Sequence, residues 1–213
     1  MVANTVLVTL SGTHGTGKST NAGRCYYLLN GSGHKFSYLR HQDILDPFGF
    51  IVRRVARILG VSPIYLDRTR PVRVLWGLYI ILIYCPILVG GIRLRRLFGY
   101  SVVCDRYIYD TLVGFRDNGV RVPLEAILIR LVPKADVSFI LDAPEDRIYR
   151  NRPEHSESFI QKEKWFYDRV AEHFHLQRVA TSDPPPVVWA RLVQEIDDVL
   201  NGRHSRRVVR GLA

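Results

Sequence analysis

Short apolar runs rich in β-branched residues alternate along this chain with longer segments whose apolar residues recur at helical spacing. A short run of this kind is typical of a strand buried in a parallel sheet. The alternation predicts a three-layer α/β/α fold with a parallel sheet of about five strands. The expected strands cover residues 5–10, 35–39, 100–104, 137–141 and 176–180, and helices are expected over 48–59 and 187–200.

A glycine-rich segment directly follows the first expected strand. Residues 12–19 read G-T-H-G-T-G-K-S, which matches the G-x-x-x-x-G-K-[ST] pattern of a phosphate-binding P-loop. Its backbone N–H groups can turn toward phosphate oxygens, and a helix that begins near Lys18 adds the positive end of its dipole. We expect Lys18 to reach the β- and γ-phosphates of ATP and Ser19 to ligate Mg²⁺. The expected ATP-binding residues are Gly12, Thr13, His14, Gly15, Thr16, Gly17, Lys18, Ser19 and Thr20.

A polar triplet, Asp105-Arg106-Tyr107, follows the third expected strand. Ligands of open parallel sheets bind beyond the carboxyl ends of the strands, so this triplet is expected near the P-loop. A carboxylate there can hold Mg²⁺ or orient the attacking group, and an arginine can clamp an anionic acceptor. An ordinary surface ion pair is the alternative. The two motifs together predict a P-loop fold that transfers the γ-phosphoryl group of ATP to a small phosphorylated acceptor.

Three segments together resemble the thymidylate kinase family: the P-loop G-T-H-G-T-G-K-S-T, the strand end C-D-R-Y and the strand end L-D-A-P. The resemblance runs over most of residues 4–200. It implies transfer of a phosphoryl group from ATP to dTMP with Mg²⁺. It also implies that Asp105 is the metal-organising or catalytic acid, and that Arg40, Arg106 and Tyr107 lie at the acceptor.

The same resemblance implies a mobile lid over about residues 143–160. Members of the family without an arginine in the P-loop use lid arginines on the transferring phosphate, and this P-loop has none. Arg150 and Arg152 are therefore the expected catalytic arginines, with Arg147 in the same segment. For each of them, a solvated helix face is the alternative.

The sequence departs from the family at three places where the family binds its acceptor. His14 stands where the family has an acidic residue that contacts the sugar of dTMP. Of the family's R-E-P-G-G-T segment only Arg40 is kept, in R-H-Q-D-I-L. The family's acceptor-binding arginine before the D-R-Y strand has no counterpart, because residues 74–92 carry no charge. A different small or lipid-linked acceptor is therefore the alternative to dTMP.

The nineteen uncharged residues 74–92 could just span a bilayer, and arginines flank them on both sides. A single span would put the P-loop and Asp105 on opposite sides of the membrane, although both belong to one sheet. We expect instead one or two helices, buried on the sheet or paired across a homodimer interface. The alternative is a peripheral contact of residues 74–96 with anionic lipid.

The composition of the chain narrows the classes of ligand and partner to be expected. The 213-residue chain has a net charge of +10, and 25 of its 30 basic residues are arginine, which suits an anionic ligand. No nucleic-acid motif accompanies the charge, so a nucleic-acid partner is not expected. A nucleotide-dependent switch is the alternative from another class, although no N-K-x-D string indicates a GTPase.

The chain length indicates the domain organisation, and the cysteines indicate the cellular compartment. A single domain over residues 1–203 followed by a basic tail over 204–213 is the simplest division. Three cysteines without a C-x-x-C pair form a poor disulfide framework, and none of the histidines has zinc-ligand spacing with them. With no signal peptide at the N-terminus, these features predict a cytoplasmic protein.

Overall fold

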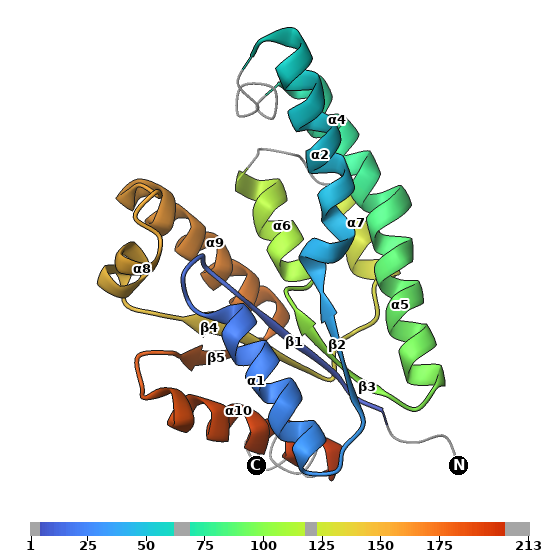
Figure 1. Ribbon diagram of the computed structural model, residues 1–213, viewed down its shortest axis with the longest axis vertical. Coiled ribbons are helices and arrows are strands. Elements are labelled where there is room, and N and C mark those ends of the chain that lie inside the picture. The colour runs from blue at the N-terminus through green and yellow to red at the C-terminus, as the bar shows by residue number, and fades with distance from the viewer. Residues whose placement is uncertain (1–4, 62–68, 118–122, 203–213) are drawn as a thin grey trace.

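A five-stranded, entirely parallel sheet forms the centre of the computed structural model (Figure 1), in the order β2-β3-β1-β4-β5. The structure describes residues 5–61, 69–117 and 123–202. The expected basic tail over 204–213 lies outside this range. The strands are β1 Leu7–Gly12, β2 Phe36–Arg40, β3 Ser101–Asp105, β4 Val137–Asp142 and β5 Gln177–Ala180. The predicted α/β/α fold with about five parallel strands is confirmed.

Helices cover both faces of the sheet, and each face has its own apolar core. α1 and α10 cover one face, where Val8 and Leu10 of β1 point. α5, α6, α7 and α9 lie against the other face, where Leu7 points. The helices are α1 Lys18–Gly31, α2 His41–Leu59, α4 Arg70–Tyr79, α5 Cys85–Leu97, α6 Ile108–Asp117, α7 Pro123–Leu131, α8 Glu145–Asn151, α9 Glu157–Phe174 and α10 Pro185–Leu200.

The uncharged segment 74–92 lies within one long helix. A π-helical turn, η1 Ile80–Tyr84, joins α4 to α5 without a break. The inner side of this helix belongs to the core of the sheet: Ile80, Tyr84, Leu88 and Ile92 are all at most 1% exposed. The outer side is exposed along most of its length. Burial on the sheet is therefore right for one side of the helix only.

The first residue of α2 contacts the π-helical turn. The His41 ring and the Tyr84 ring meet edge to face, and His41 Nδ1 and the Tyr84 hydroxyl form a hydrogen bond. Both side chains are buried. Burial lowers the pKa of His41 to about 4, because the imidazolium would lose its hydration. His41 is therefore neutral at neutral pH and ties the start of α2 to the long helix.

This contact predicts a loss of stability in mild acid. The pKa of His41 is about 4 in the folded state and near its ordinary value of 6.5 in the unfolded chain. Between these values the unfolded state binds more protons, so stability is complete above pH 6.5 and falls as the pH drops toward 4. The full contribution is on the order of 3 kcal/mol. Urea unfolding at several pH values should show a shallower loss over this window in His41→Gln than in wild type. Equal losses in the two proteins would contradict it.

Candidate functional site

The segment between β1 and α1 has the backbone geometry that a phosphate-binding loop requires. Gly12 has φ 143°, and a Cβ there would lie 2.3 Å from the carbonyl oxygen of Leu141 on β4. Gly17, the N-cap of α1, is left-handed with φ 81°. Both positions therefore need glycine. Ser19 and Thr20 lie exposed in the first turn of α1, while Thr13 and Thr16 are buried in the loop.

Lys18 is folded back over this loop and is 4% exposed. Its Nζ donates hydrogen bonds to the carbonyl oxygens of Gly12 and Thr13, each at 2.6 Å. Burial and, to a smaller extent, the nearby Arg106 guanidinium lower the pKa of Lys18 to about 8, although the carboxylates of Asp110, Glu163 and Asp105 act in the opposite direction. A phosphate at the loop would favour the charged form of this ammonium group.

Asp105, at the end of β3, is held beside the end of β1 by strand pairing. Leu10 and Arg40 flank it on the neighbouring strands. Asp105 Oδ2 accepts a hydrogen bond of 2.8 Å from the Tyr38 hydroxyl and lies 3.8 Å from Arg40 Nε. Asp105 Oδ1 is buried and has no hydrogen-bond partner among the described residues. A buried carboxylate oxygen without a partner is costly, so a water molecule, a cation or another ligand is needed to satisfy it.

The donor set here fits Mg²⁺. Magnesium prefers oxygen ligands and is commonly held by one or two carboxylates together with substrate phosphates. Asp105 Oδ1 and the hydroxyl of Ser19 are oxygens of this kind, one at the end of β3 and one in the first turn of α1. These two residues are the ones expected from the sequence.

Arg106 turns the chain sharply after β3. It has φ 71°, a left-handed conformation that costs a non-glycine residue about 1 kcal/mol or more. Its backbone N–H donates to the carbonyl oxygen of Leu10 at 3.0 Å, and its guanidinium lies 3.7 Å from Asp110 Oδ1. The same Asp110 oxygen accepts a 2.7 Å hydrogen bond from the Tyr167 hydroxyl of α9. Strain of this kind is typical of functional sites, and here Asp110 and Tyr167 maintain it.

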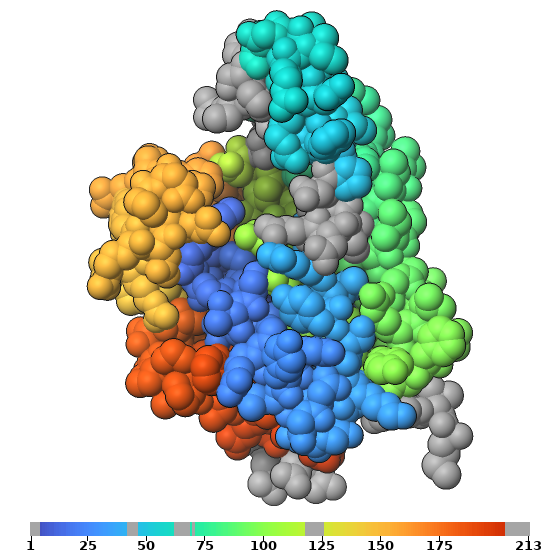
Figure 2. Space-filling view, in the orientation of Figure 1, coloured from blue at the N-terminus to red at the C-terminus, as the bar shows by residue number. Residues whose placement is uncertain are grey.

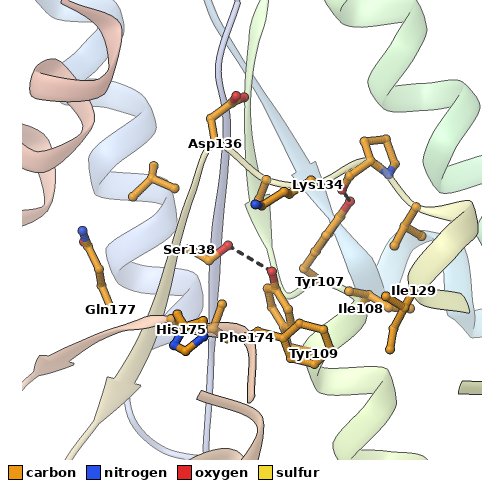
Figure 3. A pocket seen from close by; sticks show the side chains of 15 residues that line it. Tyr107, Ile108, Tyr109, Ile129, Lys134, Asp136, Ser138, Phe174, His175 and Gln177 are labelled. Atoms are coloured by element: carbon orange, nitrogen blue, oxygen red, sulfur yellow. Dashed lines mark hydrogen bonds between the residues drawn. The ribbon is translucent and has the colours of Figure 1, made fainter. Parts of the chain in front are cut away.

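The side chain of Tyr107 points into the core and away from the P-loop. Tyr107 is 1% exposed, and its hydroxyl donates a hydrogen bond to the carbonyl oxygen of Pro133. It lines a cavity of about 600 Å³ between β4, α6 and α9, together with Tyr109 and Ser138 (Figure 3). No residue of the P-loop lines this cavity. The structure therefore does not bring the Tyr107 side chain to the P-loop, because the left-handed turn at Arg106 directs it into the core.

The expected lid lies against the P-loop through one of the two predicted arginines. Asn151 Nδ2 donates to the carbonyl oxygen of Gly15 at 2.8 Å, and the Arg152 stem lies 3.4 Å from where a Cβ on Gly15 would stand. Arg150 is instead 75% exposed and pairs with Asp146 one turn earlier in α8. The structure thus brings the stem of Arg152, the residue that follows α8, to the loop, and leaves Arg150 in solvent. The Arg152 guanidinium lies 3.3 Å from Glu154 Oε1, in an exposed ion pair.

A buried carboxylate from α9 reaches the P-loop at His14. Glu163 accepts from the backbone N–H of His14 at 3.0 Å, and its second oxygen lies 2.6 Å from His14 Nδ1. The two residues are 149 positions apart, so no spacing in the sequence pointed to this pair. A carboxylate therefore lies beside position 14, although the residue at that position is histidine.

Comparison with known proteins adds no family to this geometry: no family model matches the chain, and no curated protein matches it. A three-layer α/β fold alone hosts many unrelated activities. The function must therefore be inferred from the polar groups gathered at the carboxyl edge of the sheet.

The lowered pKa of Lys18 predicts that any binding of ATP at this loop weakens in alkali. Above pH 8 the free protein loses the ammonium proton, and ATP must then bind a neutral amine or take up a proton. Titration calorimetry should show affinity falling by about tenfold between pH 7.5 and pH 9.5. Lys18→Arg keeps its charge over this range and serves as the matched control. An equal fall in both proteins would show that another group is responsible.

Proposed function

We propose that this protein is a kinase that transfers the γ-phosphoryl group of ATP to a small phosphorylated acceptor. One observation carries the proposal. The buried Lys18 of a glycine-rich loop and the buried, half-paired carboxylate of Asp105 lie at the same edge of a parallel sheet. A loop for phosphate alone would account for Lys18, but it would not account for a carboxylate oxygen kept buried without a partner.

The proposed reaction is an in-line displacement. An oxygen of the acceptor forms a bond to the γ-phosphorus, the bond from that phosphorus to the β-phosphate oxygen breaks, and ADP leaves. Lys18 and Arg152 neutralise negative charge on the transferred group, while the P-loop N–H groups hold the remaining phosphates. Mg²⁺, held by Ser19 and Asp105, supplies further charge neutralisation when bound. Catalysis then depends on positioning and electrostatics.

The acceptor side is the group of side chains around Asp105. Arg40 lies 3.8 Å from Asp105 Oδ2, and Arg106 is the next residue of the chain. Two arginines at this edge suit a phosphorylated acceptor, since a guanidinium binds phosphate through two parallel hydrogen bonds. The acceptor class we propose is a nucleoside monophosphate, with dTMP as the first candidate from the family resemblance. The carboxylate of Glu163 beside His14 supports it, because that family places an acid at this position.

A lipid-linked phosphorylated acceptor is the second candidate. α2 begins at the residue after Arg40, and its exposed Phe50 and Ile51 lie roughly 15 Å farther along the helix. An apolar tail on the acceptor could lie along these side chains while its phosphate lies at Arg40. This arrangement is the reason to test an isoprenyl phosphate beside dTMP.

A panel of acceptors tests the proposed reaction. ATP turnover should be stimulated by a nucleoside monophosphate, foremost dTMP, or by an isoprenyl phosphate, and Lys18→Ala should reduce the stimulated rate by about a hundredfold or more. Lys35→Ala, which removes an ammonium group away from the loop, should leave the rate unchanged. If no acceptor is phosphorylated, or if Lys18→Ala keeps wild-type turnover, the kinase proposal is wrong.

The lid geometry predicts unequal roles for two neighbouring arginines. Arg152→Ala should lower kcat by about a hundredfold, because a positive charge next to the transferring group is lost. Arg150→Ala should lower it by less than about threefold, because an exposed i,i+4 pair contributes little. Steady-state kinetics with the best acceptor measure both. The reverse order of effects would show that the lid rearranges when substrates bind.

A further inference from the structure

The long helix presents a continuous apolar surface to solvent. Exposed apolar side chains recur along one side of α4, η1 and α5, and Leu82 reaches 68% exposure in the middle. The helix spans 27 residues, or roughly 40 Å, and forms one edge of the molecule (Figure 2). We call this surface the outer stripe; it comprises Leu75, Leu78, Leu82, Ile87, Leu94 and Leu97.

α2 extends this surface away from the sheet. The rings of Phe48 on α2 and Tyr79 on α4 lie 5.2 Å apart, which joins the two helices. Figure 1 shows them projecting together beyond the sheet. Beyond this contact, Phe50, Ile51 and Ile58 of α2 are each more than half exposed. A soluble protein rarely exposes apolar side chains over so long a surface unless something covers it.

The packing of the long helix on the sheet is incompatible with a membrane span. By length and composition Pro71–Leu97 could span a bilayer, and it is the one such helix among the described residues. Its inner side, however, packs in the same core cluster as Val102 and Cys104 of β3. Insertion across a bilayer would remove that side from the sheet and expose the core. Only the outer stripe is available for contact.

The charges around the outer stripe identify the partner. Residues 47–104 contain nine arginines, one aspartate, Asp67, and neither glutamate nor lysine. Arg54 and Arg57 of α2 and Arg93 of α5 are exposed among the apolar side chains. Two copies of this surface paired with each other would bring arginines together without acidic partners. An anionic bilayer provides both an apolar layer for the stripe and negative headgroups for the arginines.

We propose that the outer stripe and the exposed end of α2 bind the surface of an anionic phospholipid bilayer. The apolar side chains enter the region between headgroups and acyl chains, and the arginines extend to the phosphates. This inference does not depend on the proposed phosphoryl transfer. Because α2 begins at the residue after Arg40, binding would hold the acceptor edge of the sheet close to the membrane.

Vesicle flotation with the full chain tests the proposal. The protein should float with vesicles of phosphatidylcholine that contain about 30% phosphatidylglycerol, and at least about tenfold less with phosphatidylcholine alone. Binding should weaken when salt is raised from about 0.1 M to about 0.5 M. Leu82→Glu/Ile87→Glu should reduce binding by about tenfold or more. The matched control is Val187→Glu, a similarly exposed apolar residue on α10.

Three outcomes would overturn the proposal. Binding that survives Leu82→Glu/Ile87→Glu would assign it to net charge or to the basic tail 204–213. No binding to vesicles of either composition would exclude the membrane. A dimer in light scattering that the double variant converts to a monomer, without vesicle binding, would show that a second copy covers the stripe. Thermal unfolding of the double variant close to that of wild type confirms that its core is intact, and Leu82→Ser/Ile87→Ser replaces it if it fails to fold.

Discussion

The parallel pairing of β1 with β3 on one side and β4 on the other is the constraint on which the rest of the structure depends. Buried side chains lie on both faces of these strands, so a slip of one residue would turn apolar side chains toward the wrong core. The register sets Leu10 opposite Asp105 and brings Gly12 against Leu141. The glycine-rich loop and the acidic strand end therefore lie at one edge, and neither can shift without the other.

The site gathers groups that are unfavourable for folding alone. The Lys18 ammonium is buried, one oxygen of Asp105 has no partner among the described residues, and Arg106 is held in a left-handed conformation. Asp110 and Tyr167 stabilise this arrangement from behind, with α9 supplying the tyrosine. Under the proposed function, such a site would be preorganised, because its charged groups are held in place by the fold itself.

The long helix of α4, η1 and α5 contacts two different environments. Its inner side is part of the core, while its outer side exposes leucines and isoleucines to solvent. Within the π-helical turn, Ile80 and Tyr84 both face inward, and Tyr84 reaches His41 at the start of α2. The same turn therefore connects the sheet, the segment after Arg40 and the exposed apolar surface.

Local sequence determined the strands, the P-loop and the acidic strand end, because each is a short pattern that dictates its own backbone. The all-parallel sheet then followed from alternation, and with it the proximity of Lys18 and Asp105. Only the tertiary structure decided which polar side chains meet there. Glu163 reaches His14 across 149 residues and Tyr167 reaches Asp110 across 57, distances over which no local pattern operates.

The absence of a local sequence signal also explains why the positions of the Tyr107, Arg150 and Arg152 side chains could not be predicted. Tyr107 enters the core because of the backbone turn at Arg106. The stem of Arg152, just beyond the end of α8, lies beside Gly15, while Arg150 within α8 points to solvent. The uncharged run 74–92 was visible in the sequence, but its division into a buried and an exposed side depends on where the sheet lies. The composition of the segment showed that it is apolar. Only its packing against the sheet decided which side of the helix remains in contact with solvent.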